Sequence, residues 1–189
     1  RQGCLYLYRR AGTTYGLFKT IYAKYPSEGN QFGRSIALSY DGSFMLVGDE
    51  YNDIKANNCG SVVFFSTREL DYADTNPSKF IQRYKIVPNR ADSVANLNFG
   101  RQVDINSDGT KMLVFTPHNY KSAYKIGEVF YFEKVNGFWE QKQKFSSPDG
   151  VLGDGFGCGG AMNAAGAYAL VSASNDDSGS NNGSVYAYK

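Results

Sequence analysis

One pattern of residues occurs three times in this chain and constrains its fold more than any other feature. Each copy opens with a Phe-Gly pair, continues with alternating and apolar stretches around a turn, and closes with a glycine-led run of β-branched and aromatic residues. The pairs are Phe32-Gly33, Phe99-Gly100 and Phe156-Gly157, and the closing glycines are Gly60, Gly127 and Gly183. The distance from Phe to closing Gly is 28, 28 and 27 residues, and such regular spacing indicates a repeat architecture.

Each copy has the pattern of short β-strands joined by turns. The strands predicted in the three copies are 35–39, 44–47, 61–65 and 80–87; then 101–106, 111–115, 127–133 and 139–145; then 159–163, 167–171 and 184–188. Asp-Gly between two of these runs, as at Asp41-Gly42 and Asp108-Gly109, is a strong hairpin signal. No window of useful length has a helical period.

Repeated units of four antiparallel strands are typical of β-propeller blades. A lone sheet of this kind has two apolar faces, which only neighbouring copies can bury. Two further strands, 3–8 and 15–23, precede the first copy. The prediction is therefore an all-β fold: a partial β-propeller of about three and a quarter four-stranded blades, with units at 1–24, 32–87, 99–145 and 156–189.

The predicted strands number two, four, four and three, which do not divide into whole blades. One interpretation is that the chain is a segment of a longer propeller, since propellers have four to eight blades. The other is that further copies of the chain complete a ring or filament, since unpaired edge strands associate readily.

Three stretches resemble a known family. They are Phe-Gly-x-Ser-x-Ala-Leu-Ser-x-Asp-Gly at 32–42, Pro-Asp-Gly-x-x-Gly-Asp-x-Phe-Gly at 148–157, and Asn-Asp-Asp-x-Gly-Ser-Asn-Asn-Gly-Ser-Val-Tyr at 175–186. They are similar to FG-GAP repeats, the blades of integrin-α-type propellers. The resemblance implies a propeller in an extracellular adhesion or recognition setting, and it implies structural roles for Phe32, Gly33, Phe99, Gly100, Asp154, Phe156 and Gly157.

Composition fits a Gly-punctuated β protein and argues against some partners. The net charge of +2 gives no reason to expect binding to nucleic acid or charged membrane surfaces, and no run of 18 apolar residues predicts membrane insertion. Three cysteines, Cys4, Cys59 and Cys158, leave at least one unpaired within the chain. Cys4 and Cys59 could form a disulfide, but packing of small side chains near strand ends is the preferred interpretation.

Two clusters of oxygen-bearing side chains are candidate cation sites. Asp104, Asn106 and Asp108 match the front half of the calcium loop that integrin-type blades carry, but Met112 stands where a later ligand would be needed. A turn stabilised by Asp108 explains these residues more simply. The second cluster, Asp49, Glu50, Asn52 and Asp53, could hold an ion or form a solvated loop, and the solvated loop is favoured. No other cofactor is predicted.

The long polar connections of a propeller blade are the predicted recognition elements. Those between second and third strands and those between blades leave from one face. Here they are 49–60, 116–127, 172–183, 24–31, 88–98 and 146–155. Candidate ligand-binding residues in them are Asp49, Glu50, Tyr51, Asn52, Asp53, His118, Tyr120, Asn175, Asp176 and Asp177.

The function predicted from these loops is protein interaction or adhesion at the cell surface or in the extracellular space, rather than enzymatic activity. His118, the single histidine, has no nucleophile motif beside it, although propellers do host enzymes. Two alternatives stay open: a structural subunit joined through open blade edges, and a glycan-binding propeller that uses loop aromatics. The sequon Asn182-Gly183-Ser184 fits a secreted glycoprotein, or is a simple Asn-Gly turn.

Overall fold

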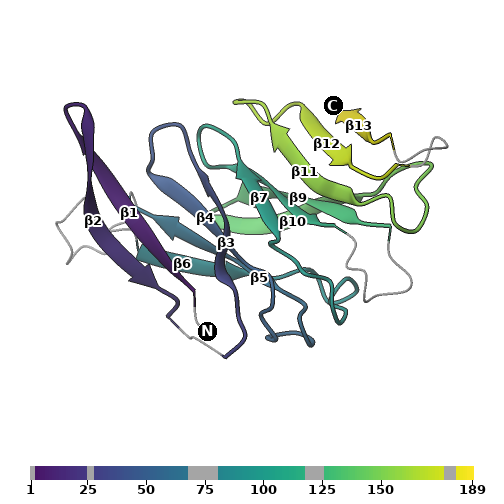
Figure 1. The fold of residues 1–189 in the computed structure, drawn as a ribbon, viewed down its shortest axis with the longest axis horizontal. Coiled ribbons are helices and arrows are strands. Elements are labelled where there is room, and N and C mark those ends of the chain that lie inside the picture. The colour runs from purple at the N-terminus through teal and green to yellow at the C-terminus, as the bar shows by residue number, and fades with distance from the viewer. Residues whose placement is uncertain (1–2, 25–27, 68–80, 118–125, 177–181) are drawn as a thin grey trace.

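The structure is a computed structural model that describes residues 3–24, 28–67, 81–117, 126–176 and 182–189. In these residues every regular element is a strand, and the strands form four separate antiparallel sheets that lie in a row (Figure 1). Within each sheet, every strand pairs with the next one along the chain. The four sheets contain two, four, four and three strands, as predicted, and the fold class of an open, propeller-like all-β arrangement is confirmed.

We refer to the sheets as blades 1 to 4. Blade 1 contains β1 (Cys4–Ala11) and β2 (Thr14–Tyr22). Blade 2 contains β3 (Phe32–Leu38), β4 (Phe44–Asp49), β5 (Ser61–Ser66) and β6 (Ile81–Ile86). Blade 3 contains β7 (Gln102–Ile105), β8 (Lys111–Thr116), β9 (Glu128–Val135) and β10 (Phe138–Phe145), and blade 4 contains β11 (Phe156–Met162), β12 (Ala169–Ala173) and β13 (Ser184–Tyr188).

The first strands of blades 2, 3 and 4 are neighbours, and backbone hydrogen bonds connect the blades through their first hairpins. Tyr40 N donates to Ser107 O at 3.2 Å, and Ser107 N donates to Ala164 O at 2.9 Å. These residues occupy equivalent turn positions in successive blades. The hairpin turns at one edge therefore form a continuous row, seen at the upper edge of Figure 1.

The Phe of each Phe-Gly pair is part of the core between blades. Phe32, Phe99 and Phe156 are at most 3% exposed. Each ring packs on the third strand of its own blade; Phe99, for example, meets the rings of Phe130 and Phe132 with centroids 5.3 and 5.9 Å away. The preceding blade covers the other side, since Leu46, Val62 and Phe64 of blade 2 belong to the same cluster as Phe99.

The closing glycine of one copy contacts the Phe-Gly pair of the next blade. A Cβ added to Gly60 would lie 2.2 Å from Phe99 O, and one added to Gly127 would lie 2.0 Å from Phe156 O. The backbones of Gly60 and Phe99 also form a parallel bridge. The closing glycine and the Phe-Gly pair of the next blade therefore meet in one contact between blades. A side chain at the closing glycine would clash with the neighbouring backbone at this contact.

Some element bounds differ from those predicted. β3 and β11 begin at the Phe of the Phe-Gly pair rather than after it. Each strand has a register shift next to its Phe-Gly glycine, and the glycines Gly33 and Gly157 adopt positive φ values of 92° and 80°. β12 lies two residues later than the predicted 167–171. Cys4 and Cys158 are free thiols, so the disulfide between Cys4 and Cys59 does not form. Cys59 is buried, as expected for packing of a small side chain, whereas Cys158 is exposed.

Candidate functional site

The connections between β4 and β5 and between β6 and β7 lie side by side on one face of the row, which we call the loop-bearing face. Asn96 N donates to Asn57 O at 2.8 Å, and Asn98 N donates to Asn58 O at 3.1 Å. The side chain of Asn58 adds a bond from Nδ2 to Asn96 Oδ1 at 3.0 Å. Two loops that are far apart in sequence are thus joined into one surface at the lower edge of Figure 1.

Asparagine makes this junction possible because it tolerates left-handed backbone better than other side chains. Asn58, Asn96 and Asn98 have φ values of 50°, 57° and 58°. The left-handed conformation turns their backbone groups toward the neighbouring loop. The Asn-rich composition of these connections therefore has a structural cause, independent of any ligand.

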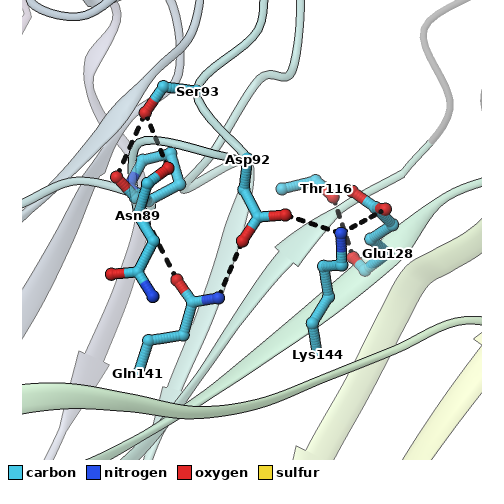
Figure 2. A network of polar contacts seen from close by, with 8 residues as sticks. Asn89, Asp92, Ser93, Thr116, Glu128, Gln141 and Lys144 are labelled. Atoms are coloured by element: carbon cyan, nitrogen blue, oxygen red, sulfur yellow. Dashed lines mark hydrogen bonds and ion pairs between the residues drawn. The ribbon is translucent and has the colours of Figure 1, made fainter.

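A polar network fixes the β6–β7 connection onto the outer strand of blade 3 (Figure 2). Lys144 Nζ on β10 contacts Asp92 Oδ1 at 2.6 Å and Glu128 Oε1 at 3.2 Å. Gln141 donates from Nε2 to Asp92 Oδ2 at 2.9 Å and accepts from Asn89 N at 3.1 Å. The pKa of Lys144 is raised mainly by its hydrogen bond to Asp92, and further by its hydrogen bond to Glu128 and the charge of that carboxylate. These bonds hold the β6–β7 connection against β10 of blade 3.

Glu50 lies on the same loop-bearing face, between two arginines from successive blades. It follows β4 directly, and its side chain is 1% exposed. Its Oε2 accepts from Arg34 Nε at 2.8 Å, and its Oε1 accepts from Arg101 Nη1 at 3.2 Å. Arg34 and Arg101 occupy equivalent positions, directly after the Phe-Gly pairs of blades 2 and 3. A buried carboxylate thus connects the two blades at their innermost strands.

Asp49 is the neighbouring buried carboxylate, at the end of β4. Its Oδ2 accepts from Asn52 Nδ2 at 2.9 Å and Asn30 Nδ2 at 3.4 Å, and Lys85 Nζ lies 4.0 Å away. Burial raises the pKa of Asp49, and the hydrogen bond from Asn52 and the charge of Lys85 oppose the rise. These contacts hold the side chain of Asp49 in place at the end of β4.

These contacts decide which predicted binding residues can reach a partner. Asp49, Glu50 and Asn52 are at most 4% exposed, so their side chains serve the fold rather than a partner surface. Tyr51 is half-buried, and Asp53 is exposed and accepts from Asn58 N at 2.6 Å. Asn175 and Asp176 are half-buried near Gly153 and Tyr186. His118, Tyr120 and Asp177 lie outside the described residues.

The oxygen atoms of the candidate calcium hairpin are directed to separate hydrogen bonds. Asp104 Oδ2 accepts from Met162 N of blade 4 at 2.6 Å, and burial raises its pKa. Asn106 Oδ1 accepts from the backbone of Thr110 and Lys111, and Asp108 Oδ1 accepts from Thr110. In the part of the chain that the structure describes, no three acidic, histidine or cysteine side chains gather as metal ligands. The geometry is that of a hydrogen-bonded turn with one link to the next blade.

Exposed apolar side chains on the loop-bearing face escaped sequence reasoning. Ile54, in the β4–β5 connection, is 57% exposed, and Val151 and Leu152, in the connection from β10 to β11, are 47% and 57% exposed. Their signal in the sequence is an isolated apolar residue inside a polar loop. Such residues alone are common on surfaces, but three on one face add apolar area to a polar surface.

The comparison with protein families matches blade 4 and the strand before it. Residues 139–188 match the model of the FG-GAP repeat, a stretch that runs from β10 to the end of β13. This part of the chain is therefore similar to an FG-GAP repeat. None of the curated proteins compared with the chain matches it. No helix among the described residues is long and apolar enough to cross a membrane.

The FG-GAP motif residues of blade 4 have visible roles in the structure. Asp154 is 2% exposed, and its Oδ2 accepts from Val151 N at 2.6 Å. Its backbone carbonyl accepts from Asn175 N at 2.9 Å, which joins the loop before β11 to the loop after β12. Asn182 of the sequon is exposed. The FG-GAP motif of this blade therefore organises the loop-bearing face as well as the core.

Proposed function

We propose that this chain is an extracellular FG-GAP-type interaction or adhesion module that binds a protein partner through its loop-bearing face. The observation that carries the proposal is the junction of the β4–β5 and β6–β7 connections, which the Asn58–Asn96 hydrogen bond and the Lys144 network hold in place. Loops held on a rigid scaffold suit recognition, because little conformational entropy is lost on binding. An FG-GAP repeat in a propeller-like fold supports an interaction module of this type.

The exposed side chains of this face support a protein partner. Ile54, Val151 and Leu152 supply apolar area among polar residues such as Asp53, and protein interfaces combine an apolar centre with a polar rim. The exposed sequon at Asn182 supports a secreted setting, because glycans are added at accessible Asn-x-Ser positions.

The test compares two surface variants on an array of extracellular proteins and a glycan array. Replacement of Ile54, Val151 and Leu152 by Ser removes the apolar part of the loop-bearing face. Replacement of Tyr40, in a hairpin turn, and Phe138, at the start of β10, by Ser changes two side chains that are 92% and 65% exposed. We expect the first variant to lose at least tenfold in binding to the array protein that the unaltered chain captures, while the second keeps it. Equal binding by both would refute the proposal, and hits on glycans alone would replace it with the glycan-binding alternative.

A second candidate function, a structural subunit of an extracellular assembly, is supported by the exposed face of blade 4. Val185 is 67% exposed, whereas its equivalents Val62 and Val129 are fully buried against the following blade. Leu170 is 53% exposed, whereas its equivalent Leu113 is 2% exposed. A surface with the composition of a blade interface favours association through that face. Sedimentation at increasing concentration tests this: association that Leu170→Lys with Val185→Lys abolishes supports it, and a monomer at every concentration refutes it.

A further inference from the structure

Equivalent residues differ between the two interfaces of blade 3. The residue after each Phe-Gly pair is Arg34 in blade 2, Arg101 in blade 3 and Cys158 in blade 4. The residue after the second strand is Glu50 in blade 2 and Pro117 in blade 3. The interface between blades 2 and 3 therefore has a carboxylate between two arginines, whereas the interface between blades 3 and 4 has a proline with Arg101 and Cys158.

A cavity of about 160 Å³ lies at the second interface. It is lined by Arg101, Pro117, Gly153, Gly155, Cys158, Ser174 and Asn175. The volume is far above the roughly 10–15 Å³ that admits one water molecule, and Cys158 and Ser174 are exposed, so a small polar group can enter from solvent. The cavity occupies the region where the first interface has the side chain of Glu50.

We propose that this cavity binds a carboxylate from outside the chain, which interacts with Arg101 as Glu50 does at the first interface. Among the described residues, Glu50 is the one acidic partner of Arg101, through a single contact from Nη1 at 3.2 Å. A guanidinium has five N–H donors in a planar fork, so Arg101 can serve two carboxylates. The hydroxyl of Ser174, which donates to Asn175 Oδ1 at 3.4 Å, belongs to another lining residue.

The local charge favours an anion at this position. Arg101 is the one charged side chain among the residues that line the cavity, and it is more than 40% exposed. The nearby carboxylate of Asp154 is buried and accepts a hydrogen bond from Val151 N. Rigid backbone surrounds the cavity, because Asp154 ties the loop of Gly153 and Gly155 to Val151 and Asn175. A preorganised arginine beside a small cavity suits a carboxylate better than a neutral ligand.

This inference rests on the proposed function for the source of the carboxylate: an Asp or Glu side chain of the protein partner at the loop-bearing face. A free small carboxylic acid has the same chemistry. The probes are therefore acetate, and a short peptide with one central Asp beside the same peptide with Asn. The readout is the rate at which iodoacetamide, a neutral reagent, alkylates Cys158, followed by mass spectrometry of the cysteine-containing peptides.

We expect acetate to slow alkylation of Cys158 in a saturable way, and acetamide to leave the rate unchanged. A peptide source predicts that the Asp peptide protects at lower concentration than acetate and that the Asn peptide does not protect. Equal potency of acetate and the Asp peptide would refute the partner side chain as source and leave a site for free small carboxylates.

Two variants separate binding from folding. Arg101→Gln should weaken protection by about tenfold or more, the loss expected for a hydrogen bond to a charged group. Arg34→Gln is the matched control. It removes an ion pair with the same Glu50 from an arginine of similar exposure, but Arg34 does not line the cavity. Pro117→Glu adds a carboxylate from the chain itself and should make external acetate ineffective.

Equal protection in Arg101→Gln and Arg34→Gln, or none by acetate and the Asp peptide in the folded unaltered chain, would overturn the inference. These outcomes are independent of the proposed function, which is tested by array binding of the Ile54, Val151 and Leu152 variant. Array binding without acetate protection removes the carboxylate site alone. Acetate protection without any array partner removes the interaction module and keeps the site.

Discussion

Replacing Gly127 by Ala tests whether the contact between blades explains the repeat. Gly127 precedes β9 with a φ of 98°, and a Cβ there would lie 2.0 Å from Phe156 O of blade 4. Gly137, in the turn between β9 and β10, has a φ of 87°, but its Cβ would have nothing within 4 Å. The two substitutions carry the same backbone strain, and only the first creates a steric conflict.

The expected magnitudes follow from this difference. A left-handed conformation costs a non-glycine residue roughly 1–2 kcal/mol, which is the whole cost expected for Gly137→Ala. At Gly127 the obstacle is a backbone carbonyl, and carbon-to-oxygen contacts normally require about 3.3 Å or more, so blades 3 and 4 must separate by about 1 Å. Overpacking of a buried contact adds roughly 1–3 kcal/mol, because Phe156 and Val129 lie fully buried beside it.

The assay is urea unfolding of the two variants and the unaltered chain, followed by far-UV circular dichroism. Fluorescence of Trp139, the single tryptophan, reports separately on the interface between blades 2 and 3, where its ring meets Phe64 edge-on at 5.4 Å. We expect Gly127→Ala to lower the free energy of unfolding by at least ~1 kcal/mol more than Gly137→Ala does. Losses that agree within about 0.5 kcal/mol would refute the steric argument.

Three further predictions concern the core and its polar links. Phe99→Ala should lower the free energy of unfolding by about 3–5 kcal/mol in urea titrations, while Phe138→Ala, at a side chain that is 65% exposed, should change it by less than ~1 kcal/mol. Glu50→Ala should lower it by about 1–3 kcal/mol, since solvent screens the half-exposed arginines left behind; no loss would contradict the role of Glu50 between blades. The pKa of Lys144 is raised in the folded state by its bond to Asp92, so its stabilisation is present below the unfolded pKa of about 10.4 and is lost as pH rises through the folded pKa. The stability difference between the unaltered chain and Lys144→Met should therefore stay constant from about pH 6 to 9 and shrink above pH 10.4, and a constant difference at all pH values would argue against the link.

The repeat predicts the fold because strand periodicity and turn chemistry are local properties. Alternating residues and Asp-Gly turns locate the hairpins to within a few residues, and regular spacing implies that copies pack on one another. Burial of polar side chains is not local. A solvated loop is predicted at Glu50 because nothing directly beside it in sequence is basic. The side chain is instead buried, and its partners Arg34 and Arg101 stand 16 and 51 residues away. The structure of the loop-bearing face thus depends on contacts between copies that no single copy contains.

The closing glycine marks the register of the repeat, but the reason for it lies outside its own copy. Within one copy, Gly60 and Gly127 precede a strand, a position where many residues are acceptable. Their requirement arises from the backbone of Phe99 and Phe156, each of which belongs to the following copy. The structural unit of this chain therefore begins at a closing glycine of one copy and includes the Phe-Gly pair of the next.

Gly183 provides a decisive comparison, because it has the same place in the repeat as Gly127 but a different neighbour. Its φ is 70°, and a Cβ there would meet Ser174 O of its own blade at 3.1 Å, a contact that a shift of a few tenths of an ångström relieves. Gly183→Ala should therefore cost about 1–2 kcal/mol in urea unfolding, like Gly137→Ala. If the position of the glycine in the repeat determined the loss of stability, Gly183→Ala would instead cost as much as Gly127→Ala. That result would show that the closing glycine is required by its own blade and would remove the contact between blades as the reason for the repeat.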